Sequence, residues 1–292
     1  MNIFSGLEEI VKTDCSLREY TWYGMGGKAD YLVVPQDVEQ LKTVVTRCNE
    51  NNLPFYVLGF GSNLLIKDKG VKGAVIKLGG AEFAETKFED EWVTAGGGAS
   101  LNNLVLDCVR KGLSGLEPLT GIPGSVGGAV KINSGGSFGD IGAAVQSVML
   151  MDKDVNVFEK TKPELIFDYR HSNISASFIL GAKIKLAAGE PEQIMRTTKE
   201  IWIRKKNSQP LSSRNSGCIF RNPPGMSAGA LIDRAGLKGL AVGGAMVSEK
   251  HANFIIANDG CSSSDVIRLI EIARQRVKEN FDVDLELEIE IW

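Results

Sequence analysis

The chain has 292 residues, of which 43% are hydrophobic and 24% charged, and its formal net charge is −3 at pH 7. This length allows one large domain or two smaller ones, and the apolar content is ample for a buried core. A slightly acidic chain without a block of basic residues and interleaved aromatics lacks the electrostatic footprint of a nucleic-acid-binding protein. We therefore expect no nucleic-acid partner.

The N-terminal stretch and the cysteines limit the compartment and the metal chemistry. MNIFSGLEEIVKTDCS shows no basic region followed by an apolar run, and no stretch of the chain reaches the ~18 apolar residues of a membrane span. We therefore expect a cytoplasmic protein without membrane contact. The five cysteines are odd in number and never spaced as CxxC, which argues against a disulfide framework and a zinc site.

The first half of the chain mixes short apolar runs with amphipathic segments. Helical periodicity predicts helices within residues 37–54 and 100–115, the second with Ser100 as N-cap and Gly112 as its stop. Strand-like runs surround them at 29–35, 54–59, 73–78 and 91–96. Short strands mixed with helices indicate the α+β class.

The second half continues the same mixture. Strands are predicted within 145–159, 177–189 and 252–259, and helices within 191–207 and 262–281. The alternating end, DVDLELEIEIW, predicts a strand that turns its three glutamates away from its apolar residues. A polar loop rich in Ser, Pro, Asn and Gly begins near residue 208, so we divide the chain into domains 1–206 and 207–292.

Three glycine-rich segments stand out at 21–27, 57–65 and 121–130. Consecutive backbone amides with little side chain around them bind anions such as a pyrophosphate. None of the segments matches GxGxxG in its Rossmann context or GxxxxGK[ST], so we expect neither a Rossmann fold nor a P-loop. Each segment alone is also compatible with a tight turn and close packing, but three in one half of the chain favour a cofactor cradle.

A series of motifs makes the chain similar to a known family. VLGFGSNLL, GLEPLTGIPGSVGGAVKINSGG, FDYRHS, GCIFRNP and LELEIEI follow one another in this order. With them the chain resembles the UDP-N-acetylenolpyruvoylglucosamine reductases, flavoenzymes of bacterial peptidoglycan precursor synthesis. The resemblance implies an FAD-binding fold of the vanillyl-alcohol oxidase type with two α+β subdomains. A smaller α+β substrate-binding domain would follow, with the C-terminal strand returning to the active site.

The resemblance also implies the ligands. FAD would be the cofactor, NADPH a co-substrate, and UDP-N-acetylglucosamine enolpyruvate the substrate. Residues expected along the flavin are Gly59, Gly61, Ser62, Asn63, Leu64, Gly121, Gly124, Ser125 and Gly128. Some oxidases of this fold attach FAD through a histidine in the N-terminal half, but the only histidines here are His171 and His251. We therefore expect a dissociable, non-covalent flavin.

Three residues are expected to carry the chemistry by the same resemblance. Arg170 of FDYRHS and Glu288 of LELEIEI match the residues that stabilise the enolate, and Cys218 of GCIFRNP replaces the serine that usually donates the proton. A thiol is a competent acid, with a reference pKa of ~8.5. The alternatives are a structural salt bridge for Arg170, a solvated surface acid for Glu288 and a buried apolar thiol for Cys218.

Candidates for the substrate diphosphate are Lys206, Arg221 and Asn222, because guanidinium, ammonium and amide donors suit phosphate oxygens. The interval between FDYRHS and GCIFRNP lacks room for the extra substrate-covering loop of some relatives, which indicates the shorter subtype. Without a second nucleotide-binding motif, we expect NADPH and the substrate to use one pocket in turn. A flavin oxidase of sugars or alcohols and a non-catalytic sugar-nucleotide sensor remain the alternatives.

Overall fold

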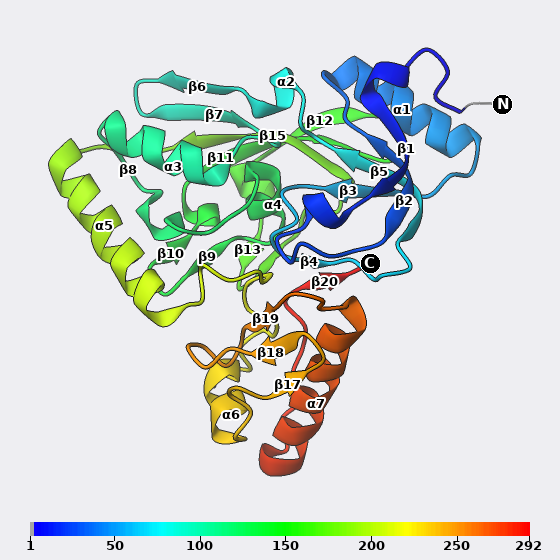
Figure 1. Ribbon diagram of the computed structural model, residues 1–292. Helices are drawn as coiled ribbons and strands as arrows, with labels where there is room; N and C mark the ends of the chain where they lie inside the picture. The colour runs from blue at the N-terminus through cyan, green and yellow to red at the C-terminus, as the bar shows by residue number, and fades with distance from the viewer. Residues whose placement is uncertain (1–2) are drawn as a thin grey trace. The chain divides into compact units, whose positions relative to one another are not determined.

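The computed structural model describes residues 3–292, which divide into two compact units (Figure 1). Unit 1 holds residues 3–14 together with Asp30–Phe60 and Lys72–Ile203. Unit 2 holds Cys15–Ala29, Gly61–Val71 and Arg204–Trp292. Sequence reasoning does not foresee that two short N-terminal segments join the C-terminal part. The predicted division of binding roles between 1–206 and 207–292 stays a prediction.

A four-stranded sheet with the order β1-β2-β5-β3 lies largely in unit 1. Its strands are β1 (Val11–Ser16), β2 (Lys28–Val33), β5 (Val71–Lys77) and β3 (Phe55–Leu58), and β3 runs parallel to β5. The helix α1 (Val38–Glu50) buries Leu41, Val44 and Val45 in one apolar cluster with residues of β2 and β5. This stripe is the face that the sequence periodicity predicts for residues 37–54.

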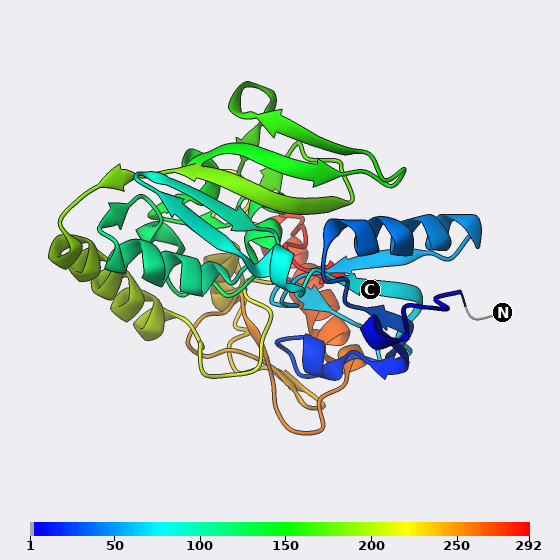
Figure 2. The same ribbon diagram turned by 90° about the horizontal axis from the view of Figure 1, so that it is seen from above.

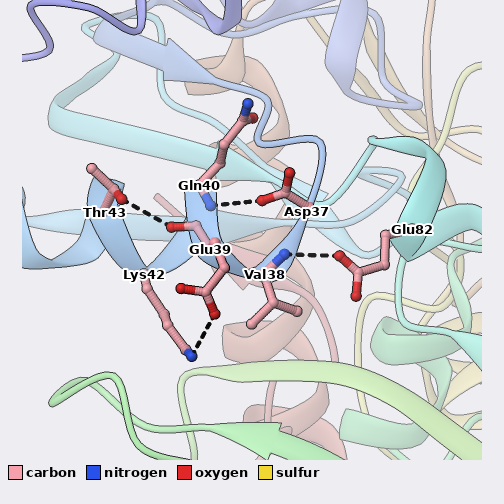
Figure 3. A network of polar contacts seen from close by, with 7 residues as sticks. All are labelled: Asp37, Val38, Glu39, Gln40, Lys42, Thr43 and Glu82. Carbon is pink, nitrogen blue, oxygen red and sulfur yellow. Dashed lines mark hydrogen bonds and ion pairs between the residues drawn. The ribbon is translucent and has the colours of Figure 1, made fainter.

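The start of α1 is held by side chains from two elements (Figure 3). Asp37 caps the helix by accepting a hydrogen bond from the Gln40 N–H at 2.7 Å. Glu82 of the short helix α2 (Ala81–Ala84) accepts another from the Val38 N–H at 2.9 Å. Two N–H groups that lack partners within the helix are thereby satisfied.

The second sheet of unit 1 has five antiparallel strands in the order β12-β11-β15-β7-β6. They are β12 (Val157–Thr161), β11 (Val145–Met151), β15 (Phe178–Lys185), β7 (Trp92–Gly96) and β6 (Thr86–Glu89). The helices α3 (Leu101–Arg110) and α4 (Val126–Lys131) pack their apolar residues with those of the sheet, and Figure 2 shows it from a second side. This packing places the glycine-rich start of α4 beside the central strand β15.

Short strand pairs and turns complete unit 1. The pairs are β8 (Leu113–Ser114) with β16 (Ala187–Ala188), β9 (Gly135–Gly136) with β10 (Gly139–Asp140), and β13 (Phe167–Asp168) with β14 (His171–Ser172). The long helix α5 (Pro191–Ser208) carries the chain from unit 1 into unit 2. Single 3-10 turns cover Glu8–Ile10, Arg18–Tyr20, Glu117–Leu119, Ile141–Ala143 and Lys162–Glu164.

Unit 2 has its own core around a small antiparallel sheet, β17-β18-β19. Its elements are α6 (Ala228–Arg234), β17 (Ala241–Val242), β18 (Ala245–Val247), β19 (Ile255–Ala257) and α7 (Ser263–Phe281). In addition, β4 (Leu64–Leu65) pairs in parallel with the C-terminal strand β20 (Glu290–Ile291). The segment 61–71 is thereby tied to the end of the chain.

Most predicted elements are found, and the α+β class is confirmed. The polar loop that begins near residue 208 is found over 209–227. It ends at α6, a helix that sequence reasoning does not predict, which Ser227 caps by accepting from the Ala230 N–H. The continuous strand over 282–292 is wrong, because the chain bends at 288–289 and only its last part forms β20.

Candidate active site

The glycine-rich segments 57–60 and 121–130 meet inside unit 1. A Cβ atom on Gly59 would lie 2.8 Å from the Ser125 Oγ, which is closer than real Cβ contacts allow. Ser125 is itself the N-cap of α4 and accepts a hydrogen bond from the Gly128 N–H at 3.2 Å. The predicted cofactor residues Gly59, Ser125 and Gly128 thus lie together, and a side chain at position 59 would displace the Ser125 hydroxyl.

The amides of this segment divide into two groups. The N–H groups of Val126 and Gly127 donate to Ala99 and Gly97, at 2.9 and 2.8 Å. Within residues 3–292, by contrast, the N–H groups of Gly121, Gly124 and Ser125 have no hydrogen-bond acceptor. Three such donors over five residues are suited to an anion. Of the amides predicted to bind an anion, those of Gly121, Gly124 and Ser125, which precede α4, are therefore the ones available to a ligand.

Lys77 is a cation next to this cradle that sequence reasoning missed. Its Nζ donates to the Gly59 carbonyl oxygen at 2.9 Å and lies 5.1 Å from the centre of the Phe60 ring. Burial lowers the pKa of Lys77 below its usual range. Lys77 is the last residue of β5, whose sequence is mostly apolar and typical of a buried strand. The pattern of β5 therefore does not mark Lys77 as a functional cation.

Arg170 lies in the tight turn between β13 and β14, where Asp168 pairs with His171. Its φ angle is +54°, a left-handed conformation that costs a residue with a side chain roughly 1–2 kcal/mol. The guanidinium carbon lies 5.3 Å from the centre of the exposed Tyr169 ring. A strained, half-buried arginine at a turn is a candidate for function rather than for folding alone.

Hydrogen bonds fasten the Arg170 turn to the far end of α4. The buried Asn133 donates to the Asp168 carbonyl at 2.9 Å and accepts from the Gly142 N–H at 3.0 Å. The Ser172 hydroxyl donates to the Lys131 carbonyl at 2.7 Å. The helix that begins at Ser125 therefore also positions the Arg170 turn within unit 1.

In unit 2 the segment that bears Cys218 is held on both sides. On one side Phe220 forms an antiparallel bridge with Leu287, and the Glu288 N–H donates to the Ile219 carbonyl at 2.8 Å. On the other side the buried Asn253 side chain accepts from the Phe220 N–H at 2.9 Å and donates to its carbonyl at 2.8 Å. Cys218 is half-buried and takes part in no disulfide bond among the described residues.

Glu288 differs from the two glutamates beside it. It is half-buried, whereas Glu286 and Glu290 are exposed. The bend at 288–289 interrupts the simple alternation, so Glu288 does not share the environment of its neighbours. Asn63, a predicted cofactor residue, donates from Nδ2 to the Glu288 carbonyl at 3.0 Å. Cys218 and Glu288 are thus carried by directly paired stretches of chain, and their catalytic roles stay predictions.

The predicted phosphate ligands have different surroundings. Arg221 pairs through its N–H with the Glu286 carbonyl at 2.9 Å, while its buried Nε has no hydrogen-bond partner in the described chain. Asn222 uses its side-chain oxygen to accept from the Ala228 N–H at 2.9 Å. Lys206 is exposed near the end of α5. Of the three, Arg221 offers the clearest unused donor for an anionic ligand.

Asn253 is the second residue that sequence reasoning missed. It lies in the motif HANFI, which reads as the start of a strand, and its contacts to Phe220 are more than 30 positions away in sequence. Asn253 lies in a turn closed by a hydrogen bond from the Phe254 N–H to the His251 carbonyl, so its sequence neighbourhood gives no signal of the distant contact. Within residues 3–292 no helix is long and apolar enough to cross a membrane.

Comparison with known proteins identifies the two parts of the chain. Residues 29–159 match the FAD binding domain family, and residues 209–292 match the C-terminal domain of UDP-N-acetylenolpyruvoylglucosamine reductase. The reductase of that name from Clostridium botulinum strain 657 is 40% identical over 283 residues, covering 96% of this chain and 92% of the relative. That from Heliobacterium modesticaldum is 40% identical over 278 residues, covering 94% and 88%.

Solved structures agree with these relatives. The UDP-N-acetylenolpyruvylglucosamine reductase from Thermus caldophilus superposes with a TM-score of 0.82 at 40% identity, covering 95% of this chain and 97% of that one. Phl p 4.0202, a glucose dehydrogenase, superposes with a TM-score of 0.52 at 14% identity, covering 65% and 45%, which is a likeness of fold alone. The predicted FAD-binding fold is confirmed. The chain belongs to the UDP-N-acetylenolpyruvoylglucosamine reductase family and is an oxidoreductase with FAD as its cofactor.

Proposed function

We propose that this chain reduces UDP-N-acetylglucosamine enolpyruvate to UDP-N-acetylmuramate with NADPH as the reductant, in peptidoglycan precursor synthesis. One observation carries the proposal: in a chain of this family, the stretch bearing Cys218 is hydrogen-bonded to the stretch bearing Glu288. That pairing supports a mechanism in which the Cys218 thiol and the Glu288 carboxyl group act on the same substrate. A nucleotide sugar and NADPH as substrates would place the reaction in the cytoplasm.

The residues of unit 1 fit the cofactor. FAD, when bound, supplies the hydride that the enolpyruvyl double bond receives. The acceptor-free amides of Gly121, Gly124 and Ser125 would hold its diphosphate, because unpaired backbone donors bind anions. Gly59, beside Ser125, would lie along the rest of the molecule. The run from Gly61 to Leu64, also expected at the flavin from the sequence, belongs to unit 2.

The proposed roles follow from the charge that develops in the reaction. Reduction of the double bond builds negative charge on the carbon next to the substrate carboxylate, and this charge spreads into the carboxylate as an enolate. Arg170, a permanent cation, would stabilise that charge, and Glu288 would act with it as the second member of the enolate-stabilising pair. The Cys218 thiol would then protonate the carbon. Arg221, Asn222 and Lys206 would bind the substrate diphosphate.

The test separates the two half-reactions by anaerobic stopped-flow absorbance of the bound flavin. We expect Glu288→Gln to leave bleaching by NADPH nearly intact and to slow recovery of the absorbance by the enolpyruvyl substrate by roughly 100-fold. Glu286→Gln is the matched control, because that neighbouring glutamate is exposed, and it should behave like the native chain. Equal slowing of both half-reactions would make Glu288 structural. Bleaching by a sugar or an alcohol instead of NADPH would replace the proposal by an oxidase.

The proton donor is tested separately. Cys218→Ala should keep the reaction with NADPH and lose turnover of the enolpyruvyl substrate, whereas Cys218→Ser should retain activity because a hydroxyl can also donate. Since a thiolate cannot donate, activity of the native chain should fall at alkaline pH, and Cys218→Ser should keep its activity there. A fully active Cys218→Ala, or superimposable pH profiles for the native chain and Cys218→Ser, would remove Cys218 from the mechanism.

A further inference from the structure

We propose that Asn63 is a positioning residue that sets the place of Glu288, an inference that rests on the proposed function. The Asn63 side chain donates from Nδ2 to the Glu288 carbonyl at 3.0 Å. The Asn63 backbone carbonyl accepts from the Glu290 N–H, also at 3.0 Å. One residue therefore bonds to the chain on both sides of the bend at 288–289.

The bend explains why Glu288 needs this contact. Beyond it, β20 is held by regular pairing with β4, and the Trp292 N–H donates to the Leu65 carbonyl at 3.0 Å. Before it, the Phe220–Leu287 bridge holds the chain. At Glu288 itself, the N–H donates to the Ile219 carbonyl and the carbonyl accepts from Asn63. These two bonds fix the peptide planes on either side of Glu288, and hence the direction in which its side chain leaves the backbone.

Only a side chain with an N–H donor at this length can make the contact to Glu288. Aspartate has the same shape as asparagine, but its carboxylate would place an acceptor against the Glu288 carbonyl. Alanine would remove the donor without adding a repulsion. Asn63→Ala therefore tests loss of the hydrogen bond alone, whereas Asn63→Asp adds a repulsion that would push the Glu288 carbonyl away.

The inference also refines the expected role of Asn63 toward the cofactor. One hydrogen of its Nδ2 serves the protein, so a contact with FAD would come from the second Nδ2 hydrogen or from its other polar atoms. The sequence run expected along the flavin, Gly61 to Leu64, thus contains the residue that holds Glu288. We infer that loss of Asn63 acts on the reaction of the enolpyruvyl substrate through Glu288, beyond any effect on flavin affinity.

The experiment combines kinetics with hydrogen exchange on the FAD-loaded protein. We expect Asn63→Ala to slow the reaction with the enolpyruvyl substrate by roughly 10-fold, and Asn63→Asp to slow it further. Amide exchange in the peptide 286–292 should be faster in both variants. In the double variant Asn63→Asp/Glu288→Gln, the rate should be no lower than in Glu288→Gln alone, because the effect of Asn63 passes through Glu288. Asn258→Asp, an exposed asparagine of unit 2, is the control for the charge change.

Three results would contradict the assignment, and they are distinguishable. If Glu288→Gln reacts slowly with the enolpyruvyl substrate and the double variant reacts more slowly still, by the combined loss of the two single variants, then Asn63 acts independently of Glu288. Unchanged exchange in 286–292 with native rates in both Asn63 variants would mean that the bond positions nothing. A fully active Glu288→Gln would remove Glu288 from the proposed function and the role of Asn63 with it.

Discussion

Replacement of Asn253 by alanine should destabilise unit 2 strongly. The Asn253 side chain is 3% exposed and satisfies both backbone groups of Phe220, accepting from its N–H at 2.9 Å and donating to its carbonyl at 2.8 Å. Phe220 is itself only 1% exposed, so water cannot easily replace the lost partner. Alanine would leave two buried polar groups of the main chain without a hydrogen bond.

The magnitude follows from the cost of such groups. A buried donor or acceptor that loses its partner costs about 1–3 kcal/mol, so the two groups of Phe220 together imply about 2–6 kcal/mol. A typical domain has a free energy of unfolding of about 5–15 kcal/mol, so this loss is a large fraction of it. Asn253→Asp should cost at least as much as alanine, because its carboxylate keeps the acceptor for the Phe220 N–H but buries a charge and places a second acceptor against the Phe220 carbonyl.

Urea unfolding of the FAD-saturated protein, followed by circular dichroism, measures this free energy. Asn258→Ala is the matched control, because its side chain is exposed, and it should change stability by less than about 0.5 kcal/mol. If Asn253→Ala lowers the free energy of unfolding by less than about 1 kcal/mol, the two contacts to Phe220 do not anchor this segment. The same variant should also lower turnover, because Cys218 lies two residues before Phe220.

Three further predictions concern the cofactor and pH. Lys77→Met should weaken FAD binding by roughly tenfold in a flavin fluorescence titration, because the charged donor to Gly59 is lost, and unchanged affinity would exclude that role. Burial, and then Lys238, lower the pKa of His251 below its usual 6.5, so the unfolded chain binds more protons just below that pH. Stability should therefore fall as pH drops below about 6.5 and level off below the folded pKa, and a His251→Gln variant with the same pH slope in urea unfolding would contradict this. Finally, acid precipitation should release the flavin, and flavin retained on the precipitated chain would indicate a covalent bond.

Local patterns in the sequence are sufficient where local physics decides the structure. Ser100 accepts from the Asn103 N–H at 3.3 Å as the predicted N-cap, and Gly112 follows the helix with a φ of +67°. The helix predicted over 262–281 is found as α7, and Ser262 and Asp265 form a capping box at its start. These elements need only a short-range periodicity and a cap, and both are visible in one window of sequence.

The C-terminal strand shows where such patterns fail. Alternation over 282–292 predicts one continuous strand, but Leu285 and Ile289 are the residues buried to 4%, four positions apart rather than two. The bend between Leu287 and Glu290 arises because the chain pairs first with the Phe220 segment and then with β4. The Phe220 segment and β4 lie far from residues 282–292 in the sequence, so the local alternation of apolar and polar residues does not predict the bend.

The same reasoning explains why asparagines hold the candidate catalytic segments. A side chain at the end of a regular strand is fixed by its ladder, whereas Cys218 and Glu288 lie on stretches with isolated pairing. The backbone groups there need partners that no neighbouring strand supplies. An asparagine amide offers one donor group and one acceptor at the reach of a peptide unit, so it can take the place of the missing strand. Asn253 does so for both backbone groups of Phe220, and Asn63 supplies the donor for the Glu288 carbonyl. Neither contact can be seen from the asparagine's own neighbourhood in the sequence, although Asn63 is expected at the flavin for another reason.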